Sequence, residues 1–376
     1  MFVSKLELKN FRNYNDFNIE FNSNLNIIIG DNAQGKTNLL EAIYFGCFGK
    51  SFRNSNDKDL ILNDNIFNYV KLNVVKKHID IKIEYRIHQK LNKEIKINNN
   101  SIRKLSEILG NIYVVLFSPE DIFLIKGSPN IRRQFINREL SNINKKYCYN
   151  LIEYRKILKQ RNNILKNSHN LNEEMLDIFT EQLVDKGTKI IIDRIYFLKK
   201  INKISNSIHK DLTNDNENLK IDYLSNISIK NEENYDKIKM EFLEKINKYK
   251  EREIRMGYTL VGPHKDDFII FLNDKEIKKY GSQGQQRTAA LSLKLSEIEL
   301  ISTETGEYPI LLLDDVFSEL DINRQINLIK IFSNTQTIIT STIFDKILKN
   351  KVTDYKLIKI ENGKIAGGKY EWEYRI

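Results

Sequence analysis

The pattern of apolar and polar residues predicts strands near both ends of the chain. Residues 3–8 and 17–21 alternate between apolar and polar positions, and residues 25–29 are almost continuously apolar. Alternation with a period of two is typical of a strand with one buried face, and a short apolar run is typical of a fully buried strand. The same reasoning predicts strands at residues 70–75, 79–87, 113–117, 268–272, 310–313, 337–340 and 355–360.

The middle of the chain, from about residue 130 to residue 249, is strongly polar. Its apolar residues recur at helical spacing, with breaks near residues 167–172 and 213–218, and they form no sustained heptad repeat, so no long coiled coil is expected. We therefore predict an α/β domain built from residues 1–125 and 257–376. A mostly helical lobe, residues 126–256, is inserted between these two halves.

Composition narrows the class of protein. The chain has 376 residues and a formal net charge of +10, which allows two or three domains and favours an anionic partner. Its two cysteines, Cys47 and Cys148, are too few for a disulfide framework or a four-thiolate metal site. No apolar run approaches the roughly twenty residues of a membrane-spanning helix, and no apolar signal region opens the chain. We expect a cytoplasmic protein with no membrane partner.

A glycine-rich loop follows the strand predicted at residues 25–29 and precedes a helix predicted at residues 38–48. In such a loop, backbone N–H groups and the helix N-terminus bind phosphate. We expect Lys36 to contact the β- and γ-phosphates of ATP and the Thr37 hydroxyl to bind Mg²⁺. The alternative is a glycine-rich turn with a surface lysine. The loop consists of Gly30, Asp31, Asn32, Ala33, Gln34, Gly35, Lys36 and Thr37.

Two carboxylates, Asp314 and Asp315, follow the apolar strand predicted at residues 310–313. Acidic residues at the carboxyl end of such a strand are typical of a nucleotide site in an open α/β sheet. Because adjacent strand residues point to opposite sides, we expect different roles for the two. Asp314 would contact magnesium, and Asp315 would be the catalytic base that orients water, acting together with Lys36. Solvated acids in a strand-end turn are the alternative.

A second glycine-containing segment precedes the helix predicted at residues 288–301. Ser282 is a suitable N-cap, and the neighbouring glycines leave backbone N–H groups accessible to an anion. This pattern supports two interpretations equally. One is a second anion site that serves a nucleotide held by another subunit, and the other is an ordinary capped helix. The segment consists of Ser282, Gln283, Gly284, Gln285 and Gln286.

Basic residues are concentrated in residues 131–166, where ten Lys or Arg face only two Glu, a net charge of +8. Arg132 and Arg133 lie at the start of this segment. Such a run is either a solvated helix face or a surface for DNA phosphates. We hypothesise that Arg132 and Arg133 contact DNA.

The phosphate loop, the segment at residues 282–286 and the acidic strand continuing to residue 321 occur in a characteristic order. This combination resembles ATP-binding-cassette (ABC) ATPase heads of the SMC type, and more closely the RecF family of bacterial recombination and repair proteins. Four further segments are similar to that family: residues 8–14, residues 117–121, residues 126–133 and residues 262–267. The resemblance extends over nearly the whole chain and is weakest between about residues 165 and 250.

The resemblance implies an ATPase that dimerises around two ATP molecules, binds DNA in that state and hydrolyses ATP slowly. Residues 282–286 would be the signature motif, which contacts the partner subunit's γ-phosphate, and residues 318–321 would be the D-loop. Arg53 is similar to an arginine linked to DNA-stimulated hydrolysis, with a surface arginine as the alternative. The implied role is recombinational repair, replication maintenance and SOS induction, with RecO and RecR as partners.

Two departures from other ABC ATPases qualify this resemblance. Residues 117–121 contain no Gln, so no Q-loop residue is assigned. No His follows the strand predicted at residues 337–340, which argues against fast, transporter-like hydrolysis. Two alternatives stay open, a nucleotide-gated DNA-binding module with negligible hydrolysis and an SMC-type head of another function. ATP cleavage in a single turnover, with and without DNA, separates the first alternative from a slow ATPase.

Overall fold

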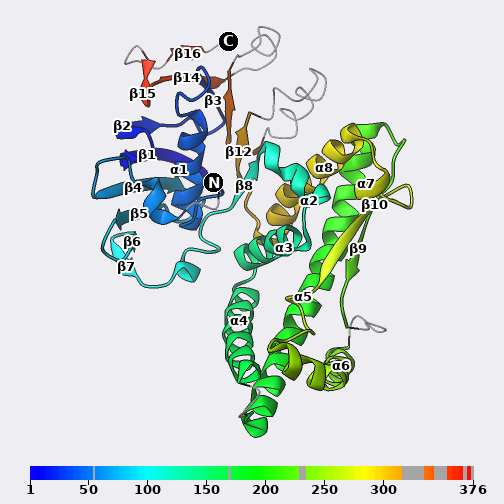
Figure 1. Ribbon diagram of the computed structural model, residues 1–376. Helices are drawn as coiled ribbons and strands as arrows, with labels where there is room; N and C mark the ends of the chain where they lie inside the picture. The colour runs from blue at the N-terminus through cyan, green and yellow to red at the C-terminus, as the bar shows by residue number, and fades with distance from the viewer. Residues whose placement is uncertain are drawn as a thin grey trace. The chain divides into compact units, whose positions relative to one another are not determined.

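The computed structural model divides into two compact units, and Figure 1 colours the chain from one end to the other. The head unit combines residues 1–121 with residues 301–376, and the inserted unit consists of residues 122–300. The residues that the structure describes are 1–53, 56–167, 171–227, 234–315, 334–342, 354–366 and 371–373.

One sheet of the head unit is antiparallel, with the strand order β2-β1-β4-β5-β6-β7. Every second residue of β4 is buried, as expected for a sheet with one covered face. The strands are β1 (Phe2–Phe11), β2 (Tyr14–Glu20), β4 (Phe67–Val75), β5 (Ile81–His88), β6 (Glu94–Ile97) and β7 (Asn100–Ile102).

The other sheet of the head unit has the order β15-β14-β3-β13-β12-β8, and β16 pairs with β14. The strands from β14 to β8 are all parallel. Both neighbours of β3 come from the C-terminal part of the chain, so this sheet needs both chain ends. The strands are β3 (Leu25–Ile29), β8 (Val114–Phe117), β12 (Ile310–Asp314), β13 (Thr337–Ser341), β14 (Tyr355–Glu361), β15 (Lys364–Ile365) and β16 (Glu371–Glu373).

Helix α1 (Lys36–Phe48) packs against strands of both sheets. It is apolar on nearly all sides, which is the pattern of a helix that is covered all round. Leu39, Ile43 and Phe45 are fully buried in the core of the head unit. Gly46 allows close contact with β4, because a Cβ there would lie 3.0 Å from a methyl carbon of Leu72.

The parallel strands bring the carboxyl ends of β12, β13 and β3 to one edge of the sheet. Asp314 of β12 pairs with Thr340 of β13, and Ser341 of β13 pairs with Ile29 at the end of β3. The phosphate loop follows Ile29 directly. Residues from opposite ends of the chain therefore meet where parallel strands end, the usual place for a ligand in an α/β sheet.

The inserted unit is mainly helical and contains one three-stranded sheet with the order β11-β10-β9. Its longest helix, α5, has 41 residues, which is roughly 60 Å of helix, and α4 and α6 pack against it (Figure 1). The strands are β9 (Leu219–Leu224), β10 (Asp267–Leu272) and β11 (Lys275–Glu276). The helices are α2 (Phe123–Lys126), α3 (Pro129–Ile143), α4 (Lys145–Lys166), α5 (Glu173–Thr213), α6 (Tyr235–Met256), α7 (Ile277–Tyr280) and α8 (Gln283–Thr305).

The α/β fold class with an inserted, mostly helical region is confirmed, and every predicted strand is present. The contact pattern divides the chain differently from the prediction, because residues 257–300 belong to the inserted unit rather than to the head. The reason is strand β9, which lies in a region predicted to be helical and pairs along its whole length with β10. This pairing joins residues 267–272 to the inserted unit.

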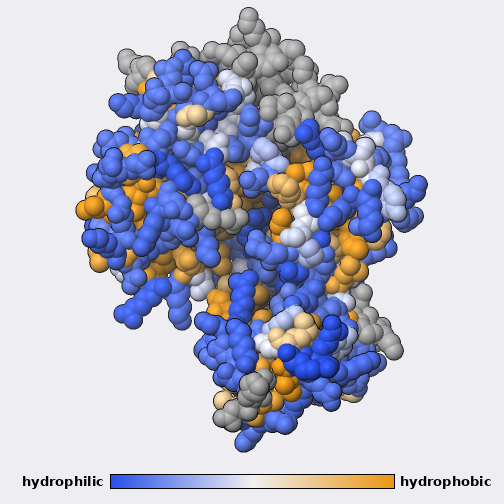
Figure 2. Space-filling model, viewed as in Figure 1, coloured by the Kyte–Doolittle hydropathy of each residue, from blue (hydrophilic) through white to orange (hydrophobic). Residues whose placement is uncertain are grey.

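The surfaces of both units are mainly hydrophilic on the face shown in Figure 2, with scattered apolar patches. Within the described part of the chain, no helix combines the length and the apolar character needed to span a bilayer.

Candidate functional site

The backbone of the phosphate loop depends on two glycines. A Cβ on Gly30 would collide with the carbonyl oxygen of Ile360. Gly35 has a φ of 115°, in the region that favours glycine, and a Cβ there would lie 2.6 Å from Asn13 Nδ2. Gly35 also caps α1, so the loop leads directly into the N-terminus of that helix. The partial positive charge of this helix N-terminus favours an anion at this position.

Two turns outside the loop hold it in place. Asn13 Nδ2 donates a hydrogen bond of 3.1 Å to the Gln34 carbonyl, and the Tyr14 hydroxyl donates one of 3.0 Å to the Gly35 carbonyl. From the turn between β14 and β15, the Gly363 N–H donates to the Gln34 carbonyl at 3.1 Å. The loop conformation is therefore fixed by residues near both ends of the chain.

Lys36 is the first residue of α1, near the end of the loop, and its side chain points back towards the loop backbone. Nζ donates hydrogen bonds to the carbonyls of Gly30, at 2.5 Å, and Asp31, at 2.8 Å. Burial lowers the pKa of Lys36, and the nearby carboxylates of Asp315, Asp31 and Asp314 oppose this effect. A cation in this position can compensate the charge of a phosphate group held by the loop.

The Thr37 hydroxyl and the Asp314 carboxylate meet at the sheet edge. Thr37 Oγ1 donates to Asp314 Oδ1 at 2.8 Å, and Thr340 Oγ1 lies 2.9 Å from the same oxygen. The N–H of Asp315 donates to Thr340 Oγ1 at 3.1 Å. Burial raises the pKa of Asp314, while the hydrogen bonds from Thr37 and Thr340 and the charge of Arg53 oppose the rise. A nearby cation would further favour the ionised carboxylate.

These donors fit a magnesium ion. The two oxygens of Thr37 and Asp314 lie 2.8 Å apart, close to the roughly 3 Å between neighbouring ligands of an octahedral ion with metal–oxygen distances of about 2.1 Å. Both are hard oxygen donors, which Mg²⁺ prefers. Among the described residues, no group of three His, Cys, Asp or Glu could hold a metal alone. Phosphate oxygens would therefore have to complete the coordination.

Asp315 has a φ of 52°, which is uncommon for a residue other than glycine. The left-handed backbone turns the chain sharply after β12, so that Asp315 leaves the strand while Asp314 stays within it. The two acids therefore occupy different positions, as the sequence analysis expected from strand alternation, although the cause is a turn.

Arg53 lies beside α1 rather than among the basic residues of the inserted unit. Its Nη1 donates to Asn38 Oδ1 at 2.9 Å and lies 3.6 Å from the buried carboxylate of Glu41. Arg12 also binds Glu41, through two hydrogen bonds of 2.9 and 2.7 Å. Two arginines thus surround one carboxylate on the helix that begins at the phosphate loop. Arg53 and Arg132 belong to different units.

The segment at residues 282–285 starts α8 in the inserted unit. Ser282 and Gln285 form a reciprocal cap, since the Gln285 N–H donates to Ser282 Oγ at 3.2 Å and the Ser282 N–H donates to Gln285 Oε1 at 2.9 Å. Ser282, Gln283 and Gly284 are exposed. This capped helix start, with three exposed residues, is consistent both with a second anion site and with an ordinary capped helix.

The surroundings of Arg132 differ from those expected of a side chain that contacts DNA. Its side chain is buried, with an exposed fraction of 7%, and it makes two hydrogen bonds of 2.7 Å to the Asp267 carboxylate. Arg133 donates to the Asp266 carbonyl at 2.8 Å. Arg161 is also buried and pairs with Glu253 at 2.7 Å. A phosphate contact by Arg132 would require breaking its ion pair with Asp267, whose side chain is 17% exposed.

Other basic residues of the same segment do face solvent. Five exposed positions on α4 are spaced four, three, four and three residues apart, so they lie along one side of the helix. We call these the α4 stripe: Lys145, Tyr149, Ile152, Lys156 and Lys159. The three lysines form no ion pair with any residue that the structure describes, and Tyr149 is 58% exposed.

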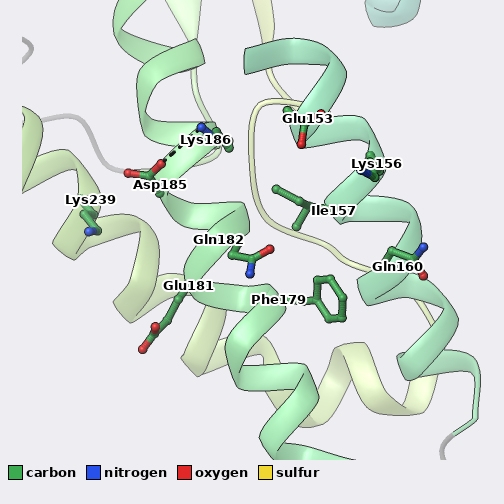
Figure 3. Close-up of a pocket in the computed structure, with 10 residues that line it drawn as sticks. All are labelled: Glu153, Lys156, Ile157, Gln160, Phe179, Glu181, Gln182, Asp185, Lys186 and Lys239. Atoms are coloured by element: carbon green, nitrogen blue, oxygen red, sulfur yellow. Dashed lines mark ion pairs between the residues drawn. The ribbon is translucent and has the colours of Figure 1, made fainter. Parts of the chain in front are cut away.

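An open pocket of about 560 Å³ lies in the inserted unit, lined by α4, α5 and α6 (Figure 3). Three carboxylates, Glu153, Glu181 and Asp185, share its wall with three lysines, Lys156, Lys186 and Lys239. The opposite charges balance, and Asp185 is already bound by Lys189 at 2.8 Å and by the Tyr235 hydroxyl at 2.7 Å. This wall offers no excess of positive charge for a nucleotide.

The structure therefore brings residues 30–37, Asp314 and Asp315 together in the head unit and places residues 282–285 in the inserted unit. The expected D-loop, residues 318–321, lies outside the described residues. Sequence reasoning missed Thr340, Asn13 and Glu41. Thr340 could have been found, because it ends the strand whose missing histidine had been noted. Nothing in the local pattern marked the other two.

Comparisons with known proteins point to one family over nearly the whole chain. The RecF/RecN/SMC N-terminal domain family matches residues 2–366. The DNA replication and repair protein RecF of Clostridium tetani is 46% identical over 363 residues, covering 96% of this chain and 99% of that protein. RecF of Alkaliphilus oremlandii is 44% identical over 366 residues, covering 97% of this chain and 100% of that protein.

Solved structures support the same assignment. The structure of the recombination mediator RecF with ATP, from the RecFOR pathway, has a TM-score of 0.91 and 37% identity, covering 99% of this chain and 97% of that one. The Smc head domain of Pyrococcus furiosus shares the fold, with a TM-score of 0.57 and 17% identity, covering 99% and 96% of the two chains. With relatives this similar over this length, the chain belongs to the RecF family of DNA replication and repair proteins.

Proposed function

We propose that this chain is an ATP-dependent DNA-binding protein of recombinational DNA repair, which dimerises around ATP and hydrolyses it slowly. One observation carries the proposal: Thr37 and Asp314, 277 residues apart in sequence, lie 2.8 Å apart next to the phosphate loop. The RecF relative whose structure was solved with ATP supports the choice of nucleotide. Replication maintenance and SOS induction are the further roles that the family implies.

In this proposal each residue of the head unit site has a separate role. Backbone N–H groups of residues 30–35 and the start of α1 bind the phosphates, and Lys36 contacts the β- and γ-phosphates. Thr37 and Asp314 hold Mg²⁺, which would neutralise the charge on the phosphate oxygens when bound. Asp315 orients and activates the attacking water.

Dimerisation would place residues 282–285 of one subunit against the γ-phosphate bound by the other. The exposure of Ser282, Gln283 and Gly284 supports this role, since a capped helix start that faces solvent is available to a ligand from outside its own chain. Gln285 supports it indirectly, by fixing the Ser282 backbone and hydroxyl.

DNA binding is best supported by the α4 stripe. Its three lysines are exposed and form no ion pair among the described residues, whereas Arg132 is engaged with Asp267. Lysine phosphate contacts would give affinity without sequence preference. Arg53 has a different proposed role, in coupling DNA binding to hydrolysis, because it contacts α1 beside the phosphate loop.

The protein partners follow from the pathway named for the solved relatives. We propose that RecO and RecR bind this chain and that it acts in the cytoplasm, where bacterial DNA is repaired. An SMC-type head of another function is less well supported, since the structural likeness to Smc heads is much weaker than the likeness to RecF.

Sedimentation with ATP, with ADP and without nucleotide, each with and without DNA, tests this function. We expect a dimer with ATP only, and DNA bound by that dimer. Ser282→Arg should bind ATP as a monomer and fail to dimerise, because the bulky side chain occupies the proposed contact. A dimer of this variant at the same ATP concentration as the unmodified chain would contradict the two-subunit site. Single-turnover cleavage then distinguishes a slow ATPase from a module that does not hydrolyse ATP.

A further inference from the structure

The end of α5 and the loop after it bind the first three turns of α8 through a buried histidine and a carboxylate. His209 Nε2 lies 3.1 Å from Glu217 Oε2, and Glu217 Oε1 accepts a 2.8 Å hydrogen bond from Gln285 Nε2. His209 Nδ1 lies 3.0 Å from Ser292 Oγ. Gln285 and Ser292 are seven residues apart, so they lie on the same side of α8. All of these residues belong to the inserted unit.

The local backbone explains how Glu217 reaches this position. Asn214 and Asp215, directly after α5, have φ values of 50° and 59°, in the left-handed region that ends a helix. The Asp215 N–H donates to the Lys210 carbonyl at 2.9 Å, which closes the last turn. The chain then reverses, and Glu217 returns to the side of α5 that carries His209.

His209 donates a hydrogen bond to Glu217 through Nε2. A carboxylate of Glu217 can only accept, so the hydrogen between the two groups belongs to the His209 ring. His209 Nδ1 lies 3.0 Å from Ser292 Oγ, a hydroxyl that can donate or accept. Burial lowers the pKa of His209, while the hydrogen bond and charge of Glu217 oppose the decrease. A neutral ring therefore satisfies both contacts, because Nε2 can donate to Glu217 while Nδ1 accepts from Ser292.

Glu217 fixes a side chain of the proposed signature motif. Gln285 Oε1 accepts from the Ser282 N–H, and its Nε2 donates to Glu217, so both ends of the Gln285 amide are held. The Ser282 hydroxyl accepts from the Gln285 N–H and keeps its hydrogen for an acceptor outside the helix. Rotation of Gln285 would release the Ser282 backbone from the cap.

We propose that Glu217 and His209 are positioning residues for the Ser282–Gln285 segment. Glu217 holds the Gln285 amide in its capping orientation, and the His209 ring N–H holds Glu217 and partly compensates its charge beside the start of α8. Without that hydrogen bond, the carboxylate charge would oppose an incoming γ-phosphate more strongly. This role rests on the proposed function of the segment in the dimer.

The test compares variants of the full chain by the ATP concentration at which half of the protein sediments as a dimer. Glu217→Ala should raise this ATP concentration about tenfold or more, as expected for a lost hydrogen bond to a charged group. Glu217→Gln keeps an acceptor for Gln285 and should stay close to the unmodified chain. Asp222→Ala is the matched control, since Asp222 is a neighbouring carboxylate on β9 that pairs only with Lys220 in the described structure.

The contribution of His209 is tested separately with His209→Leu, which should weaken dimerisation by leaving Glu217 without its hydrogen-bond donor. Adding Glu217→Gln to this variant should restore much of the loss, an outcome that damaged packing would not produce. A double variant no better than His209→Leu overturns the role of His209 in compensating the Glu217 charge. If Glu217→Ala and Glu217→Gln dimerise at the same ATP concentration, the positioning role of Glu217 is wrong. This holds whatever the stability of the His209 variant.

Two further measurements separate this inference from the proposed function. ATP affinity of the monomer should be the same in all variants, because the phosphate loop belongs to the head unit. An unmodified chain that shows no ATP-dependent dimer would overturn the proposed function and, with it, this role of Glu217.

Discussion

The two units use charged residues in opposite ways. In the head unit, Lys36, Asp314 and Asp315 lie at a sheet edge, where backbone carbonyls and hydroxyl groups hold them beside a loop that suits phosphate. In the inserted unit, Arg132 pairs with Asp267 and Arg161 with Glu253 in the interior. The charges of the first group are available to a ligand, and those of the second group compensate one another.

Buried pairs of this kind have an energetic consequence. Removing one partner leaves an uncompensated charge in a poorly polar environment, which is strongly destabilising. Removing a charge that faces a ligand site costs little folding energy and much function. Substitutions of charged residues that look alike in a sequence can therefore impair a protein for different reasons. Whether the charge is buried decides between a loss of stability and a loss of ligand binding. Each of the following predictions tests this contrast.

The largest effect is expected for Lys36→Ala. The substitution removes the cation that compensates the β- and γ-phosphates, so measurable ATP binding should be lost, together with dimerisation and DNA binding. Stability should change little, since Lys36 bonds only to two loop carbonyls among the described residues. Nucleotide titration and chemical denaturation check the two halves of this prediction. Lys58→Ala, at an exposed lysine of the same unit, is the control.

Asp315→Asn should lower the rate of ATP hydrolysis by about 10²–10⁴-fold, the usual contribution of a general base. The amide keeps the size of the side chain, so ATP binding and dimerisation should persist and the dimer should last longer. Single-turnover kinetics and sedimentation measure both. Hydrolysis at an unchanged rate would show that Asp315 is not the base.

For Arg132→Ala we expect a loss of about 3 kcal/mol in the free energy of unfolding, the low end of the range for a buried pair, because the Asp267 side chain, 17% exposed, is left without its partner. DNA binding should weaken only as far as the unit unfolds. Lys145→Ala, in the same basic segment but exposed on α4, should change stability by about 0.5 kcal/mol or less. A stable Arg132→Ala variant with weakened DNA binding would restore the interpretation of Arg132 as a DNA contact.

A smaller effect concerns pH and His264. Burial lowers the pKa of His264 to about 4, and its neutral ring lies 2.6 Å from the Tyr154 hydroxyl and 3.2 Å from the Thr259 carbonyl. The unfolded chain binds a proton near pH 6.5 and the folded chain only near pH 4, so stability falls as the pH decreases through this window. Between about pH 7 and pH 4.5 the loss should be about 2 kcal/mol.

His264→Gln keeps both hydrogen-bonding functions without the titration, so its stability should decrease by about 2 kcal/mol less over the same range. Urea denaturation at the two pH values measures this, and His78→Gln, at an exposed position, is the control. Equal pH dependence in the His264 variant and the unmodified chain would rule out His264 as the source.

The smallest effect is expected on the α4 stripe. Replacing Lys156 and Lys159 by Ala should weaken binding to all DNA sequences alike and reduce the slope of log affinity against log salt by about one unit per lost contact. Stability should be unchanged. A double variant of Lys237 and Lys248, two exposed lysines of α6, serves as the control. If the two double variants bind DNA equally, the DNA surface lies elsewhere.

The sequence predicted the elements that carry strong periodicity and missed what depends on long-range contacts. Strands β3, β12 and β13 could be recognised because each contains a run of two to four consecutive aliphatic residues. Strand β9 was missed, because Leu219–Leu224 contains two charged residues and becomes a strand only by pairing with β10.

The parts of the proposed nucleotide site could be predicted from the sequence, because the loop motif is local and the acidic pair ends an apolar strand; the structure places Thr37 beside Asp314. The surroundings of Arg132 could not be predicted, because its partner Asp267 lies 135 residues away and charge alone does not reveal burial. Glu217 also depends on tertiary neighbours, and no local spacing marks it, whereas Thr340 could be located at the end of its strand.

The position of β3 between β13 and β14 has a consequence for protein synthesis. The phosphate loop emerges early from the ribosome, but both strands that flank β3 are made last, more than 300 residues later. At about 5–20 residues per second, roughly 15–60 s pass before the first of them is available. A truncated or unfinished chain therefore lacks both strands that flank β3, and the proposed nucleotide site can be completed only after nearly the whole chain has been made.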